Sequence, residues 1–535
     1  MPSVKMKCQL FLLLFLFFPS LCVGWHVDAR QVVVVANENS TDSLALARYY
    51  MRARSIPAAN LIAIPLSKDE EISWQEFSQT LWNPLLSVLL EKKWLAGKIL
   101  SKQDHAGRNR LEIERNRIGY LVLCHGVPLR IKNDKALIKR ENFANISSSL
   151  SVSGAAVDSE LALITTEDTP ATSLINNPFY AKDTFLRKTR NAALSISRLD
   201  GPSLAVCQQL VNNTLLAEKT GLVGRAYIDA GGPYPQGDAW FRSAVNSIRK
   251  QGFDVTYDES VSLLDYDTRA DAPAIYLGWY SEKTAGRFGD PKLHFVPGAI
   301  AMHLHSFSAI TLRSVKRGWV ASLISRNAAV SFGNVAEPYL GHCTHPALFI
   351  SSLLEGNQVG EAYYRATPVW SWQGILIGDP LYRPFNVPIK EQIAQLKKND
   401  PLKYNPAQHD YIILRYANLL LASGKTNEAL AELATAIRHH PSLPLRFALA
   451  RIAKHPTLAW SSDDATDTSD PGLLVEIARY LKKNASHRDA LRVYKFILQH
   501  SDLFQRNRRK LLPEAIETAT ASGDWNAAQN WRKEE

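Results

Sequence analysis

The residues best suited to chemistry lie in one short stretch, residues 297–308. An apolar run there ends in His303 and His305, followed by Ser306 and Ser308. An imidazole can exchange a proton near neutral pH, and a hydroxyl beside it can act as a nucleophile. In an open α/β sheet, ligands and reacting groups collect at the carboxyl ends of the strands. We therefore predict a functional site where this strand ends.

A second polar cluster, at residues 333–345, lies between a strand-like run and a helix-like run. It contributes the carboxylate of Glu337 and the imidazole of His345. Because parallel strands end at the same edge of a sheet, we expect the two clusters to meet there. A carboxylate near an imidazole suits general acid–base catalysis. The predicted catalytic residues are His305, Ser306, Glu337 and His345.

The same clusters also offer ligands for a metal ion. Residues 303 and 305 of a strand point to one face, so their imidazoles could converge. Structural zinc sites use four nitrogen or sulfur ligands, but no H-E-x-x-H or paired C-x-x-C motif is present here. A zinc site is therefore an alternative hypothesis, competing with ordinary packed histidines, and its ligands would be His303, His305, His342 and His345.

A Gly-Asp-Pro turn follows a further apolar run, at residues 378–380. Aspartate in such a turn often bonds to nearby backbone. Such an aspartate could also orient a catalytic side chain by a hydrogen bond, without contacting the substrate itself. We predict that positioning role for Asp379, with a purely structural turn as the alternative.

The first half of the chain has charged motifs of its own, at residues 158–160 and 198–202. Paired carboxylates can perform acid–base work, although capping and ion pairing are their more common roles. Cys124 and His125 are also adjacent there. Neighbouring residues of a strand point to opposite faces, so these two are poorly placed to form a catalytic pair.

Strand-like runs alternate with helical periodicity over most of the chain, and the pattern starts again near residue 221. This alternation predicts parallel sheets covered by helices. We expect an α/β protein with two successive lobes, at residues 30–215 and 216–388. From residue 400 the strand-like runs disappear, and paired helical patterns approximate the tetratricopeptide repeat. An all-α tail is predicted over residues 400–535, with a polar interruption at 461–470.

The amino-terminal residues have the layout of a secretory signal peptide. Lys5 and Lys7 precede the apolar run at residues 10–18, and small residues follow at 22–24. The run is shorter than the roughly 20 residues that span a bilayer. We therefore expect a signal peptide at residues 1–24 and export to the periplasm or the extracellular space, with a retained anchor as the alternative. No transmembrane segment is expected after it.

Composition sets further limits. A chain of 535 residues exceeds what one hydrophobic core usually supports, so several domains are expected. The formal net charge is +11, but the basic residues are scattered and give no specific nucleic-acid signal. Only three cysteines lie beyond residue 24, too few for a disulfide framework. The chain has no G-x-S-x-G, P-loop or G-x-G-x-x-G motif, so the simplest support for hydrolase and nucleotide-binding readings is missing.

Five motifs together resemble a family of exported bacterial proteins of unknown function. The likeness covers about residues 30–388 and leaves the helical tail outside. It implies no established activity. The motifs are VDSELAL at 157–163, RLDGP at 198–202, HSF at 305–307, EPYL at 337–340 and GDPLYRPF at 378–385.

More distantly, the chain resembles the gingipain-type cysteine peptidases, whose caspase-like sheets form two successive lobes. In those enzymes a His-Gly follows one strand of the second lobe, and a cysteine follows the next. On that register the catalytic histidine falls at Trp279 or Tyr280 and the cysteine at His305 or Ser306. Neither residue type is retained. The resemblance therefore implies the fold without the thiolate chemistry of a cysteine peptidase.

These observations favour a non-peptidase binding or scaffold protein of the cell envelope, with a degenerate caspase-like site. A protein partner would bind through the helical tail, as repeat arrays commonly do. The alternative is a hydrolase that uses Ser306 or His305 at the carboxyl edge of the second lobe.

Overall fold

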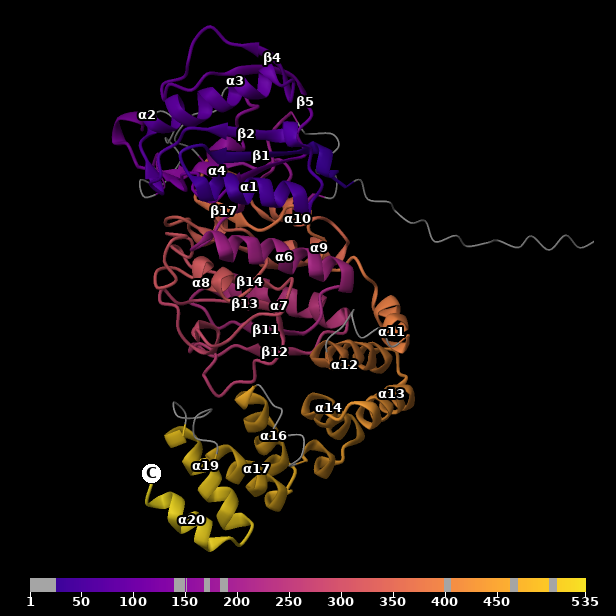
Figure 1. Cartoon of the computed structure of the whole chain (residues 1–535). Coiled ribbons are helices and arrows are strands. Elements are labelled where there is room, and N and C mark those ends of the chain that lie inside the picture. Colours follow the sequence, from indigo (N-terminus) through magenta and orange to yellow (C-terminus); the bar gives the residue numbers. More distant parts are fainter. Residues whose placement is uncertain are drawn as a thin grey trace, which may run out of the picture.

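Two sheets and then a helical region follow one another along the molecule (Figure 1). The structure is a computed structural model that describes residues 26–138, 150, 152–167, 174–182, 191–398, 406–461, 470–499 and 508–535. The expected signal peptide at residues 1–24 lies outside the described residues, as does most of the polar interruption at 461–470.

The larger sheet has six strands in the order β15-β17-β10-β6-β1-β2. Neighbours are parallel, except for the antiparallel pair β15 and β17. Strand β1 contains four consecutive valines, and every residue in it is buried, as expected for a strand covered on both faces. The strands are β1 (Val32–Asn37), β2 (Leu61–Ile64), β6 (Tyr120–Cys124), β10 (Ile196–Leu199), β15 (Ser331–Asn334) and β17 (Gly374–Ile377).

Capped helices flank this sheet. Helix α1 (Thr41–Ala53) begins at Ser40, whose side chain accepts a hydrogen bond from the Ser43 N–H. Helix α6 (Leu204–Thr220) begins after Ser203 and ends at Gly221, which has a φ of 78°. Smaller elements complete this part: β3 (Glu71–Ile72), α2 (Trp74–Glu76), α3 (Asn83–Glu91), β4 (Leu95–Ile99), β5 (Leu111–Asn116), β7 (Arg130–Ile131), β8 (Ala155–Ala156), α4 (Val157–Leu161), β9 (Ile175–Asn176) and β16 (Val369–Trp370).

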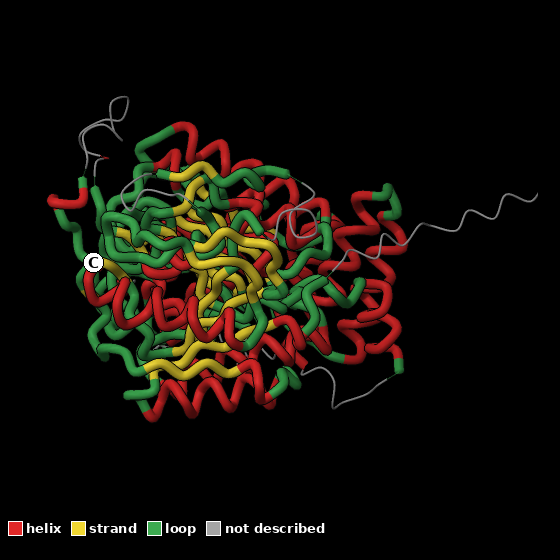
Figure 2. Tube along the Cα trace, turned by 90° about the horizontal axis from the view of Figure 1, so that it is seen from above, coloured by secondary structure: helices red, strands yellow, loops and turns green. Residues whose placement is uncertain are grey.

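The smaller sheet has four parallel strands in the order β12-β11-β13-β14. In Figure 2, strands run through the middle of the molecule with helices on either side. The strands are β11 (Arg225–Asp229), β12 (Val255–Asp258), β13 (Pro273–Gly278) and β14 (Ile300–His303). The helices of this part of the chain are α7 (Pro235–Lys250), α8 (Val320–Ser325), α9 (Pro346–Leu354) and α10 (Val359–Ala366).

The two sheets are joined. A parallel bridge pairs Ile300 of β14 with Val330, directly before β15. One continuous hydrophobic core extends across both sheets. Strands β15 and β17 lie within residues 216–388, the expected second lobe. They nevertheless pair in the six-stranded sheet, whose other strands come from the expected first lobe. The division into lobes therefore differs from a simple cut at residue 215.

A helical region follows the sheets and lies beyond β12 in Figure 1. Its helix α12 contacts the end of α7, where the Arg415 side chain donates a hydrogen bond to the Gln251 carbonyl at 2.8 Å. No helix among the described residues is both long enough and apolar enough to cross a membrane. The helices are α11 (Ile389–Lys397), α12 (Pro406–Ala422), α13 (Thr426–His439), α14 (Leu443–Ala453), α16 (Pro471–Lys483), α17 (His487–Gln499), α19 (Arg508–Ala521) and α20 (Trp525–Arg532).

Candidate functional site

Strand β14 leads into a cavity of about 340 Å³ at the carboxyl edge of the four-stranded sheet. The chain leaves the sheet after His303, and His305 and Ser306 then border the cavity. Trp279 and Tyr280, which directly follow the neighbouring strand β13, border the same space. The two positions at which a gingipain-type peptidase would carry its catalytic histidine and cysteine, residues 279–280 and 305–306, therefore both border this cavity. The lining residues are Tyr234, Gln236, Trp279, Tyr280, Leu304, His305, Ser306, Glu337, Pro338, Tyr339, Leu340 and Cys343.

Exposed aromatic side chains gather around this cavity. Tyr234 is 54% exposed, Tyr280 46% and Tyr339 39%. Trp279 is buried behind them, and its indole N–H donates to the Asp238 carboxylate at 2.9 Å. Large aromatic side chains held in water around a concavity mark a binding surface.

The cavity also has a negative character, although the chain as a whole is basic. Glu337 is exposed at its rim, and the described lining residues include no lysine or arginine. Burial raises the pKa of Tyr280, and the nearby charges of Glu337 and Glu282 raise it further. Burial lowers the pKa of His305, and the same two carboxylates offset part of that decrease. The charges of Glu337 and Glu282 therefore act on both Tyr280 and His305, and they make the surroundings of the two rings more negative.

His305 and Ser306, two of the predicted catalytic residues, do not form a catalytic pair here. The His305 Nδ1 accepts a hydrogen bond from the Phe307 backbone N–H at 3.3 Å. A neutral imidazole that accepts at Nδ1 carries its proton on Nε2, so Nε2 cannot take a proton from a hydroxyl. Glu337 instead accepts a hydrogen bond from the Tyr339 N–H at 2.9 Å.

Cys343 borders the cavity, and its thiol is free and buried. Its S–H donates to the Tyr339 carbonyl across 3.5 Å. Burial raises the pKa of this thiol to about 12, with a further contribution from Glu337. Only the thiolate attacks a carbonyl, so this cysteine is not activated as a nucleophile.

His303 is a core histidine. Its ring is fully buried and stacks on Trp319, with the ring centroids 3.8 Å apart. Nε2 accepts from the Ser281 N–H at 3.1 Å, so Nδ1 carries the proton and donates to the Tyr276 hydroxyl at 3.0 Å. Burial lowers its pKa well below the ordinary value. Both nitrogens are occupied, and no metal can reach them.

The four histidines therefore do not form the zinc site predicted as an alternative. No three of them bring their ring nitrogens within 4.8 Å of one another. His345 lies at the start of α9, where Nδ1 accepts from the Leu348 N–H, and its ring packs at a tilt against Trp240, with the ring centroids 4.4 Å apart. Burial lowers its pKa to about 4. It caps a helix and does not line the cavity, so its predicted catalytic role is not supported. His342 packs edge-on against Trp372.

Asp379 is also placed differently from the prediction. It follows β17, which belongs to the six-stranded sheet, and its carboxylate is fully buried. It accepts hydrogen bonds from the Tyr50 hydroxyl at 2.8 Å and the Arg54 guanidinium at 2.5 Å. It also accepts from the Leu381 N–H, as expected of a structural turn. It therefore ties α1 to β17 and does not support His305.

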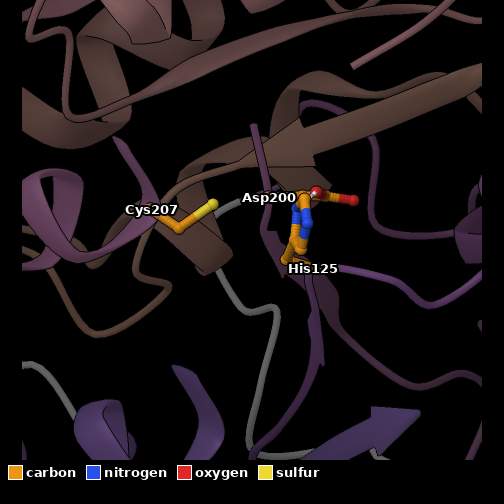
Figure 3. A group of neighbouring side chains, drawn as sticks. All are labelled: His125, Asp200 and Cys207. Carbon is orange, nitrogen blue, oxygen red and sulfur yellow. Dashed lines mark hydrogen bonds and ion pairs between the residues drawn. The ribbon is translucent and has the colours of Figure 1, made fainter. Parts of the chain in front are cut away.

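A pair that sequence reasoning missed lies at the carboxyl edge of the six-stranded sheet. His125 follows β6 and Asp200 follows the adjacent parallel strand β10. The His125 Nδ1 lies 2.9 Å from the Asp200 Oδ1, and the Cys207 sulfur points toward the pair (Figure 3). Each of the two residues is followed by a glycine, in His125-Gly126 and Asp200-Gly201, and His125 comes directly after an apolar run. The sequence alone does not show that β6 and β10 are neighbours, which is what brings the two residues together.

The motifs around residues 158 and 198 are engaged in ion pairing. Arg198 is fully buried and donates to both oxygens of Asp158, at 2.7 and 3.0 Å. It also donates to Asp200 and to the carbonyls of Val127 and Pro128. Pairing, the more common role expected for such carboxylates, is thus the observed one.

Comparison with known proteins adds little. No family model matches the sequence, and no curated protein matches it. A solved structure titled "Structure of Protease" is similar at 10% sequence identity, covering 67% of this chain and 79% of that chain, with a TM-score of 0.33. A likeness at that score carries no argument about the site. The structure itself defines a mixed α/β protein with parallel sheets and a helical carboxy-terminal region.

Proposed function

We propose that this chain is a non-peptidase binding protein, and that the cavity beside His305 takes a ligand carrying a positive charge. The observation that carries the proposal is the combination of three exposed tyrosines with the exposed Glu337, in a cavity whose described lining residues include no lysine or arginine. A cation over an aromatic face gains about 0.5–2 kcal/mol, more when it is desolvated. Small-molecule sites are typically apolar cavities of about this size with a few polar groups.

The alternative, a hydrolase using Ser306 or His305, has less support. It would need His305 to accept a proton at Nε2, whereas the hydrogen bond from Phe307 favours the opposite tautomer. It would also need a group that orients the imidazole. The described hydrogen bonds of Glu337 do not reach His305.

We further infer that the protein is exported to the cell envelope and that the helical region recruits a protein partner. The support for export is the sequence of residues 1–24 alone. The support for a tetratricopeptide-like tail is the succession of helix pairs α12–α13, α16–α17 and α19–α20. Stacked pairs of this kind offer extended surfaces for partners.

Replacing Tyr280 and Tyr339 with alanine, singly or together, should weaken binding of a small organic cation. With choline as the probe, we expect the Kd to rise about tenfold for the double variant, because the stacking faces are removed. NMR line-shape titration measures this for weak ligands. Trp525→Ala, which removes an exposed aromatic side chain of the helical region, is the matched control and should leave the Kd unchanged. Equal affinity in the tyrosine variant and the wild type would place the binding elsewhere.

A further inference from the structure

The pair His125 and Asp200 has the geometry of an oriented base. Leu199 of β10 and Cys124 of β6 are register partners, so the next residue of each strand emerges side by side. The His125 backbone N–H donates to the Leu199 carbonyl at 2.9 Å, which holds the two strand ends together. Both residues lie at the carboxyl edge, where open α/β sheets place their ligands.

Asp200 is held as a carboxylate. It is fully buried, and burial alone would raise its pKa. Arg313 at 2.6 Å, the hydrogen bond from His125 and the charge of Arg198 together hold the pKa well below its ordinary value. The Gly201 N–H donates to it as well, at 2.8 Å. An ionised carboxylate only accepts hydrogen bonds, so the imidazole must donate from Nδ1.

The second nitrogen of His125 is then an acceptor. A neutral imidazole protonated at Nδ1 carries a lone pair at Nε2. The side chain is 13% exposed, whereas Asp200 beneath it is not exposed at all. A base oriented by a buried carboxylate and itself partly exposed is the arrangement found in hydrolytic triads.

Cys207 is not the missing nucleophile. Its thiol is fully buried, and burial together with the charge of Asp200 raises its pKa well above the ordinary value. A metal ion is also disfavoured, although one ligand atom from each of His125, Asp200 and Cys207 lies within 4.8 Å of the others. Arg198 and Arg313 already balance the carboxylate charge, and a cation would have to displace Arg313.

We infer that His125 and Asp200 form a general-base site, separate from the cavity beside His305, that activates water toward a small ester. The partial exposure of the imidazole limits the substrate to a small molecule. In the step, water gives a proton to Nε2 and its oxygen bonds to the ester carbonyl carbon. The bond from that carbon to the leaving oxygen breaks, and the imidazolium gives its proton to that oxygen, so that an acid and an alcohol leave and His125 is neutral again. Asp200 is the positioning residue that stabilises the imidazolium.

Hydrolysis of 4-nitrophenyl acetate by the full chain tests this inference. We expect His125→Gln to lower the second-order rate constant at least fivefold, and the exposed control His455→Gln to leave it unchanged. Asp200→Asn should lower the rate and move the midpoint of its pH profile to lower pH, which a merely structural role would not do. An unchanged rate in His125→Gln overturns the inference.

A second measurement needs no variant. Nitrogen-15 NMR of the wild-type histidines distinguishes the two neutral tautomers. The inference requires the proton of His125 on Nδ1, and a proton on Nε2 overturns it. Because this site does not share residues with the cavity, its failure leaves the cation-binding proposal standing.

Discussion

Replacing Arg198 with methionine should lower the free energy of unfolding by about 3–5 kcal/mol. Arg198 is fully buried between Asp158 and Asp200. It also donates to the backbone carbonyls of Val127 and Pro128, in the segment that follows β6. Methionine fills much of the same volume but leaves the two buried carboxylates without this partner. Breaking one side of a buried ion pair leaves an uncompensated charge in a medium that solvates it poorly. Urea denaturation followed by tryptophan fluorescence measures the loss.

Arg242→Met is the matched control. Arg242 pairs with Glu259 at 2.7 Å, but both side chains are at least half exposed. Such surface pairs contribute little to stability, because water and salt screen them, so this variant should unfold at nearly the wild-type urea concentration. If the two variants lose similar stability, the network around Arg198 does not hold the six-stranded sheet together as described.

The second large effect concerns pH. Asp229 ends β11 and is buried, and burial raises its pKa from the ordinary 3.8 to about 7. Its Oδ1 has no hydrogen-bond partner in the part of the chain that the structure describes, whereas Oδ2 accepts from the Leu264 N–H. The folded state therefore holds a proton that the unfolded state releases above its ordinary pKa. Between these two values the free energy of unfolding must fall as the pH rises.

Asp229→Asn removes this titration while keeping the bond from Leu264. We expect the variant to be more stable than the wild type at pH 8 by about 2–4 kcal/mol, and nearly equal to it at pH 4. Burial also raises the pKa values of Asp410 and Glu361 to about 7, so part of the decrease in stability with rising pH remains in the variant. Unfolding by urea at several pH values measures the difference, with the exposed Asp69→Asn as control. A variant with the wild-type pH dependence would contradict a protonated Asp229.

Local patterns were enough to locate the cavity but not to assign its residues. The apolar run before His303 predicted a buried strand with a functional end, and β14 leads directly to the cavity. Strand alternation placed His303 and His305 on one face. The chain leaves the sheet after His303, however, so the two rings diverge, and Trp319 from a later segment covers the first.

Strand order accounts for the other differences. Asp379 lies among Tyr50 and Arg54 because β17 inserts beside β10, although a long stretch of chain separates them. His125 meets Asp200 for the same reason, since β6 and β10 are neighbours only in the folded sheet. Periodicity reports which face of an element is buried, but it carries no information about which strand lies next to which.

The measurement that tests the central claim most directly compares choline with its neutral isostere, 3,3-dimethylbutan-1-ol, in NMR titrations of the wild-type protein. The two probes have nearly the same shape and differ in charge, so the ratio of their Kd values isolates the preference of the cavity for a cation. We predict that choline binds about tenfold more tightly and that its binding shifts the signals of Trp279. Glu337→Gln should reduce that ratio. Equal binding of the two probes, or a preference for the neutral one, would contradict a cation site beside His305.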